Sequence, residues 1–117
     1  MKTVVLDYPT DTEQCATWID LERVTMVERY SRTTLPELLE RARTADVLVT
    51  WEMPLRREVL DYITRPRVII VPHGRRDALV ELPIATQLGL SVYEFAHDPD
   101  VTCSWITSVA DLLAGSD

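Results

Sequence analysis

Glycine is scarce in this chain, and the three glycines, Gly74, Gly89 and Gly115, lie far apart. A phosphate-cradling loop needs several glycines two to five residues apart, so that backbone amides can approach a pyrophosphate at a helix N-terminus. Neither the dinucleotide-binding G-x-G-x-x-G pattern nor the G-x-x-x-x-G-K-[ST] pattern of nucleotide triphosphatases fits these positions. The sequence therefore predicts no nicotinamide, flavin or nucleoside triphosphate cofactor.

The shortage of lysine and of long apolar runs excludes further classes of binding partner. Lys2 is the only lysine, and 12 basic against 19 acidic residues give a net charge of -7, which argues against nucleic acid and anionic membranes. No apolar run approaches the roughly 18 residues of a membrane helix, and the N-terminus is too acidic for a signal peptide. We therefore expect a cytoplasmic protein of one domain over residues 1–117.

Cysteine is equally scarce. Cys15 and Cys103 form no C-x-x-C pair, so we expect two plain buried thiols in preference to a disulfide, a metal site or a redox site. Pairing Cys103 as a nucleophile with His97 or His73 lacks a third group to orient the base, so no catalytic residue is assigned.

Short apolar runs alternate with helical patterns, which is typical of βα units around a parallel sheet. Five such units predict a flavodoxin-like three-layer α/β sandwich with a five-stranded parallel sheet. A capping box is predicted from Thr34 and Glu37, and Pro83 conflicts with a continuous helix over 78–88. The expected strands are 3–7, 24–29, 46–51, 67–72 and 90–95, and the expected helices 11–22, 34–43, 54–63, 78–88 and 99–114.

Several segments, taken in order, resemble the N-terminal substrate domain of the D-isomer-specific 2-hydroxyacid dehydrogenases. They are KTVVLD (2–7), LLERARTADVLVT (38–50), PLRREVL (54–60), RVIIV (67–71) and IATQLGLSV (84–92). The resemblance implies that family's fold and cleft. The other lobe of those enzymes binds NAD and supplies the catalytic arginine, glutamate and histidine, and its motifs do not occur here. After the fourth predicted strand, the family's glycine-rich carboxylate-binding loop is replaced by PHGRRDALVE (72–81).

Ligands of open parallel sheets bind beyond the carboxyl ends of the strands, which gives a set of candidate ligand-binding residues. Within it, His73 and the two arginines beside it could hold a small anion or could form a solvated loop, and Trp51 could stack on a planar ligand or cap the core. The same edge should also carry Pro9, Met53, His97 and Asp98. The candidates are Asp7, Tyr8, Trp51, Glu52, His73, Gly74, Arg75 and Arg76.

The segment 99–114 carries an apolar stripe that must fold back on this domain or bury against another chain. The stripe consists of Val101, Trp105, Ile106, Val109, Leu112 and Leu113, which we take as a candidate homodimer or partner interface. We therefore expect a stand-alone ligand-binding, regulatory or assembly module without metal or cofactor. The alternatives are a small enzyme acting on an anionic substrate at the strand ends, and one subunit of a split dehydrogenase.

Overall fold

The structure is a computed structural model, and it describes residues 1–115. All five strands are parallel and follow the order β2-β1-β3-β4-β5, which confirms the predicted α/β fold and sheet. The elements are β1 Lys2–Val5, η1 Thr10–Thr12, α1 Trp18–Glu22, β2 Met26–Arg29, α2 Leu35–Ala42, β3 Val47–Val49, α3 Arg57–Leu60, β4 Val68–Pro72, α4 Arg76–Leu79, α5 Leu82–Gln87, β5 Ser91–Phe95 and α6 Ser104–Ala114.

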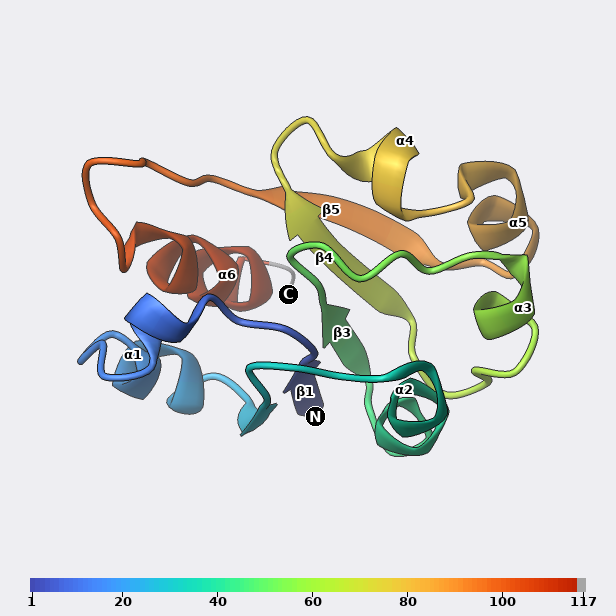
Figure 1. Ribbon diagram of the computed structural model, residues 1–117, viewed down its shortest axis with the longest axis horizontal. Helices are drawn as coiled ribbons and strands as arrows, with labels where there is room; N and C mark the ends of the chain where they lie inside the picture. Colours follow the sequence, from blue (N-terminus) through green and yellow to red (C-terminus); the bar gives the residue numbers. More distant parts are fainter. Residues whose placement is uncertain (116–117) are drawn as a thin grey trace.

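Helices cover both faces of the sheet, with α1 and α6 on one side and α2, α3 and α5 on the other (Figure 1). Successive strand residues point to opposite faces, so Leu48 of β3 enters one core cluster while Val47 and Val49 enter the other. In β4, Ile69 and Val71 likewise face away from Ile70. The central strands are buried on both sides, as their β-branched sequences predict.

Local signals set the start of α2. The Thr34 hydroxyl accepts a hydrogen bond from the Glu37 amide at 3.4 Å, and the Glu37 carboxylate accepts one from the Thr34 amide at 2.9 Å. This confirms the capping box, which satisfies two amides that the first helical turn leaves unpaired.

The predicted helix over 78–88 is two short helices, α4 and α5, separated by Val80 and Glu81. Pro83 therefore lies in the first turn of α5, where its missing N–H costs no helical hydrogen bond, and the conflict disappears. Gly89 follows α5 with a φ of +75°, a left-handed conformation that glycine adopts without strain.

The helix predicted over 11–22 is interrupted: η1 is a short 3₁₀ helix, turns follow over 13–17, and only Trp18–Glu22 is α-helical. Two side-chain hydrogen bonds favour the turns: the Thr12 hydroxyl donates to the Pro9 carbonyl at 2.6 Å, and the Trp18 indole donates to the Thr12 carbonyl at 2.8 Å. The last helix also starts later than predicted, at Ser104. A turn closed by the Asp98 carboxylate, which accepts the Asp100 amide at 2.9 Å, precedes it.

Among the described residues, no helix combines the length and the apolar character of a membrane span.

Candidate ligand pocket

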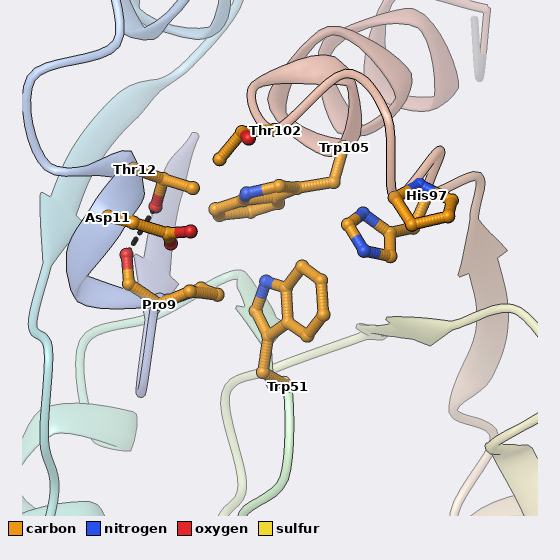
Figure 2. A pocket seen from close by; sticks show the side chains of 8 residues that line it. Pro9, Asp11, Thr12, Trp51, His97, Thr102 and Trp105 are labelled. Carbon is orange, nitrogen blue, oxygen red and sulfur yellow. Dashed lines mark hydrogen bonds between the residues drawn. The ribbon is translucent and has the colours of Figure 1, made fainter.

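A pocket of about 250 Å³ opens at the carboxyl ends of the strands, between the loops that follow β1, β3 and β5 and the first turn of α6. We call it the aromatic pocket (Figure 2). It lies where the parallel topology places ligands. Its walls are Pro9, Asp11, Thr12, Trp51, His97, Pro99, Thr102 and Trp105.

Trp51 is the wall residue that follows β3, and Asp7 positions it. The Asp7 carboxylate accepts the backbone amides of Trp51 at 2.7 Å, Glu52 at 2.7 Å and Met53 at 2.9 Å. Three amides on one carboxylate hold the turn after β3 in a single conformation. Asp7 therefore positions Trp51 without lining the pocket itself.

Burial raises the pKa of the Asp7 carboxyl above its ordinary value of 3.8, while the backbone hydrogen bonds of Trp51, Glu52 and Met53 act in the opposite direction. Desolvation outweighs the three hydrogen bonds because the carboxylate has exchanged most of its water for protein. The group is committed to the turn and is not presented to the pocket.

The Trp51 ring packs against three other aromatic rings, of which Trp105 and His97 also line the pocket and Phe95 does not. Its centroid lies 5.2 Å from that of Phe95, 5.5 Å from that of Trp105 and 4.8 Å from that of His97. The contacts with Trp105 and His97 are edge-to-face, the arrangement that aromatic quadrupoles favour. Of these rings, Trp105 and Phe95 are fully buried, and His97 is exposed.

Two indole N–H groups at the pocket have no hydrogen-bond acceptor among residues 1–115. They are the Nε1 atoms of Trp51 and Trp105, and both are buried. Figure 2 shows both nitrogens on the side of the pocket that Asp11 borders. A buried donor without an acceptor costs free energy, and such groups are uncommon in folded proteins.

The two cysteines form a disulfide, with 5.9 Å between their Cα atoms, so the prediction of two plain thiols is wrong. The thiols are 88 residues apart in sequence, and only the packing of α1 against α6 brings them together. The bond joins the segment before α1 to the N-cap of α6, beside pocket residues Thr12 and Thr102.

Disulfides persist mainly in oxidising compartments. The cytoplasmic location therefore stays a prediction, and the disulfide weighs against it.

The loop after β5 is tied down to α6. The Ser108 hydroxyl accepts the Ala96 amide at 2.7 Å, and the Ser104 hydroxyl accepts the Asp98 amide at 3.1 Å. These bonds hold His97 between them at the pocket wall.

Of the predicted ligand-binding residues, four lie together. Asp7, Tyr8, Trp51 and Glu52 border a second hollow of about 280 Å³, which shares Trp51 and Pro9 with the aromatic pocket. Tyr8 itself is buried, and its hydroxyl donates to the Glu13 carboxylate at 2.9 Å, so its polar atom is already paired.

Of the remaining four candidates, three border two other hollows, and His73 borders neither. Arg75 borders one with Trp51 and Glu52, whereas Gly74 and Arg76 border another with Glu94. The Glu94 carboxylate accepts the Gly74 amide and lies 3.5 Å from His73 Nδ1. The chain's own carboxylate therefore takes the position where an anion would meet this loop, and the structure does not gather His73, Arg75 and Arg76 around one point.

The apolar stripe of α6 folds back on this chain. Trp105, Ile106 and Val109 are fully buried and Leu113 nearly so, all within the core cluster beside α1. Leu112 is half-buried, and Val101, which precedes the helix, is 53 % exposed. Four of the six interface candidates are thus core residues, because α6 packs with α1 over one face of the sheet.

The predicted set lacks most walls of the aromatic pocket. Asp11, His97 and Pro99 carry a usable signal, since they follow strand ends in sequence. Thr102 and Trp105 carry none, because only the docking of α6 brings them to the same place. No group of three or more His, Cys, Asp or Glu residues within 1–115 is arranged to hold a metal ion.

Comparison with known proteins supports the fold assignment. No protein-family model matches the sequence, and no curated protein does. Solved structures do match. A phosphoglycerate oxidoreductase of Vibrio cholerae superposes with a TM-score of 0.71 over 85 % of this chain and 32 % of its own, at 18 % identity. D-lactate dehydrogenase of Escherichia coli gives 0.60 over 83 % and 31 %, also at 18 %.

D-2-hydroxyisocaproate dehydrogenase gives a TM-score of 0.65 over 86 % of this chain and 31 % of its own, at 12 % identity. The chain thus spans about a third of the length of the structures it matches. The resemblance to D-2-hydroxyacid dehydrogenases is confirmed at the level of the fold, as a partial domain of these enzymes.

Proposed function

We propose that this chain is a ligand-binding module with the fold of a D-2-hydroxyacid dehydrogenase domain, and that the aromatic pocket is its binding site. One observation carries the proposal: two buried indole N–H groups without acceptors lie at a pocket on the carboxyl edge of a parallel sheet. Both nitrogens are closed to solvent in this conformation, so a bound molecule would supply their acceptors by turning the rings toward the pocket.

The way the pocket is built also supports binding. The Asp7 carboxylate fixes the Trp51 turn, serine hydroxyls fix the loop of His97, and the disulfide fixes the start of α6. Walls that are held in advance lose little conformational entropy when a ligand binds, which favours affinity.

An assembly role receives less support from the described residues. The stripe on which a homodimer through 99–114 depended is mostly buried in the chain's own core. A dimer formed there would have to use Val101, Leu112 and their polar neighbours alone.

A screen of small fragments by protein NMR tests the proposal. The chain has three tryptophans, so it gives three indole N–H signals. We expect bound fragments to shift those of Trp51 and Trp105 most. Trp51→Leu should remove binding, whereas Tyr62→Ala, at an exposed aromatic residue bordering a different hollow, should leave it unchanged. A diverse library that moves none of the three signals would contradict the proposal.

A second candidate is that the chain acts as the substrate lobe of an oxidoreductase, with the nucleotide lobe supplied elsewhere. Its support is that the matched enzymes are D-2-hydroxyacid oxidoreductases, of which this chain covers about a third. The test is to isolate the tagged chain with any bound partner from its host. The complex should reduce 2-oxo acids with a nicotinamide cofactor, and the chain and the partner separately should not. A complex without that turnover would reject the candidate.

A further inference from the structure

We infer that the aromatic pocket selects small organic cations, such as quaternary or protonated amines, over anions of the same shape. The inference rests on the proposed function, and it names the chemical class of the ligand.

The first observation is the charge at the pocket mouth. Of the acidic residues in the loop segments 9–17 and 96–103, Asp11 lines the pocket, whereas Glu13, Asp98 and Asp100 are not among its walls. Neither segment contains lysine or arginine, although Arg29 donates to the Glu13 backbone carbonyl at 2.9 Å. Asp11 borders the pocket directly and is exposed, with no ion pair among the described residues. Within a chain of net charge -7, this mouth attracts cations and repels carboxylates.

The second observation is the aromatic surface. A cation gains electrostatic energy against the face of an aromatic ring, and tryptophan is the strongest partner. Trp51 and His97 border the pocket with two proline rings. This combination of aromatic walls and a carboxylate is suited to a cation with an apolar body.

The chain already uses the same interaction next to the pocket. The Arg29 guanidinium lies 4.4 Å from the centroid of the Trp18 ring, and Trp18 packs edge-to-face against Trp105. Within residues 1–115, no cationic side chain is stacked on Trp51 in the same way. In this aromatic cluster, one cation position is already occupied by Arg29, on the Trp18 ring. The aromatic wall at the pocket has no cationic side chain from residues 1–115 stacked on it.

The indole donors refine the ligand. Trp51 Nε1 and Trp105 Nε1 require an acceptor, and a simple alkylammonium has none. A hydroxyl or carbonyl oxygen near the ammonium would meet both requirements. An amino alcohol such as choline has that arrangement, which makes it a suitable probe.

Three probes of nearly the same shape test the inference. They are choline, its uncharged isostere 3,3-dimethylbutan-1-ol, and the anion 3,3-dimethylbutanoate. Binding is followed through the Trp51 indole NMR signal and through tryptophan fluorescence. We expect choline to bind about tenfold more tightly than the alcohol, and the carboxylate to bind most weakly.

Two variants separate a local effect from the overall field. Asp11→Asn should weaken choline binding about fivefold without changing binding of the alcohol. Asp111→Asn removes the same charge from an exposed position on α6 outside the pocket, and it should leave both affinities unchanged. Neither position is buried, so loss of folding will not imitate the result.

Each outcome decides something. If the alcohol or the carboxylate binds as tightly as choline, the cation inference is overturned while fragment binding still stands. Failure of all three probes likewise overturns the inference, and the fragment screen then decides the proposed function separately. Equal losses in Asp11→Asn and Asp111→Asn would show that net charge, and not the pocket, attracts the cation.

Discussion

The two faces of the sheet are packed in different ways. The cluster beneath α2, α3 and α5 is built of aliphatic side chains such as Leu38, Leu48 and Ile69. The cluster beneath α1 and α6 contains Tyr8, Trp18, Phe95 and Trp105, with Trp51 packed against it. The disulfide, the unpaired indole donors and the aromatic pocket all lie on this second face.

The difference separates stability from function within one small domain. Aliphatic side chains fill space and leave no polar atom to satisfy, so the first face needs only close packing. Hollows open on both faces, but among residues 1–115 the buried side-chain donors without acceptors belong to the rings of the aromatic face. We therefore expect changes on the aliphatic face to alter stability alone, and changes on the aromatic face to alter the pocket as well.

Leu48→Ala should have the largest effect. Leu48 is fully buried in the aliphatic cluster, and removing its side chain leaves a cavity that costs about 2–5 kcal/mol of unfolding free energy. Urea unfolding measures this loss. Where the variant still folds, its Trp51 indole signal should respond to ligands as in the parent, and an altered response would show that the faces are coupled.

Loss of the disulfide should come next. Replacing Cys15 and Cys103 together by serine removes a link between residues 88 apart, which costs about 2–4 kcal/mol. In reductant, the parent should have the same free energy of unfolding in urea as the variant. Reductant should not change the unfolding of the variant itself. We also expect weaker ligand binding, because α6 and the segment before α1 carry pocket walls. Unchanged stability would show that the pairing does not form in solution.

Asp7→Asn should have an intermediate effect. An amide cannot accept on both of its heavy atoms, so at least one of the Trp51, Glu52 and Met53 amides loses its acceptor. The cost is about 1–3 kcal/mol. Because the Trp51 turn loosens, ligand-induced shifts should fall as well, which distinguishes this variant from Leu48→Ala.

The same pair of proteins tests the pKa of Asp7. Since burial raises the folded-state pKa above the ordinary value of 3.8, the stabilisation from Asp7 is complete below that value and declines as pH rises through the folded-state pKa. The stability difference between parent and Asp7→Asn should therefore shrink with rising pH. Glu28 and Asp46, whose pKa values are lowered by hydrogen bonds from Lys2, are present in both proteins and cancel. A difference that grows with pH would contradict this assignment.

Thr34→Ala should have the smallest effect. It removes the acceptor for the Glu37 amide at the start of α2, which costs about 1 kcal/mol. Thermal or urea unfolding will show the loss. The pocket lies across the sheet and should not respond, and a change in ligand affinity would again break the separation of the two faces.

Much of the fold could be predicted because its signals are local. Apolar runs located all five strands, Thr34 and Glu37 located the start of α2, and a βα repeat implies a parallel sheet. The ends of 11–22 were predicted less well, because side-chain hydrogen bonds such as that from Trp18 to the Thr12 carbonyl compete with the helix. The helix predicted over 54–63 is also shorter, since α3 covers only Arg57–Leu60. The strand-end rule located Asp7 and Trp51, yet it could not distinguish a side chain that builds a turn from one that meets a ligand.

The order of its residues alone was enough to set the α/β class of this chain, its parallel sheet and the absence of a glycine-rich phosphate loop, because each depends on spacing along the chain. The pairing of Cys15 with Cys103, the burial of the α6 stripe and the aromatic pocket were decided only when α6 docked against α1 and the sheet. The disulfide joins residues 88 positions apart, and the pocket joins residues as distant as Pro9 and Trp105. No local pattern records such contacts, since they depend on which faces of distant helices and strands bury one another.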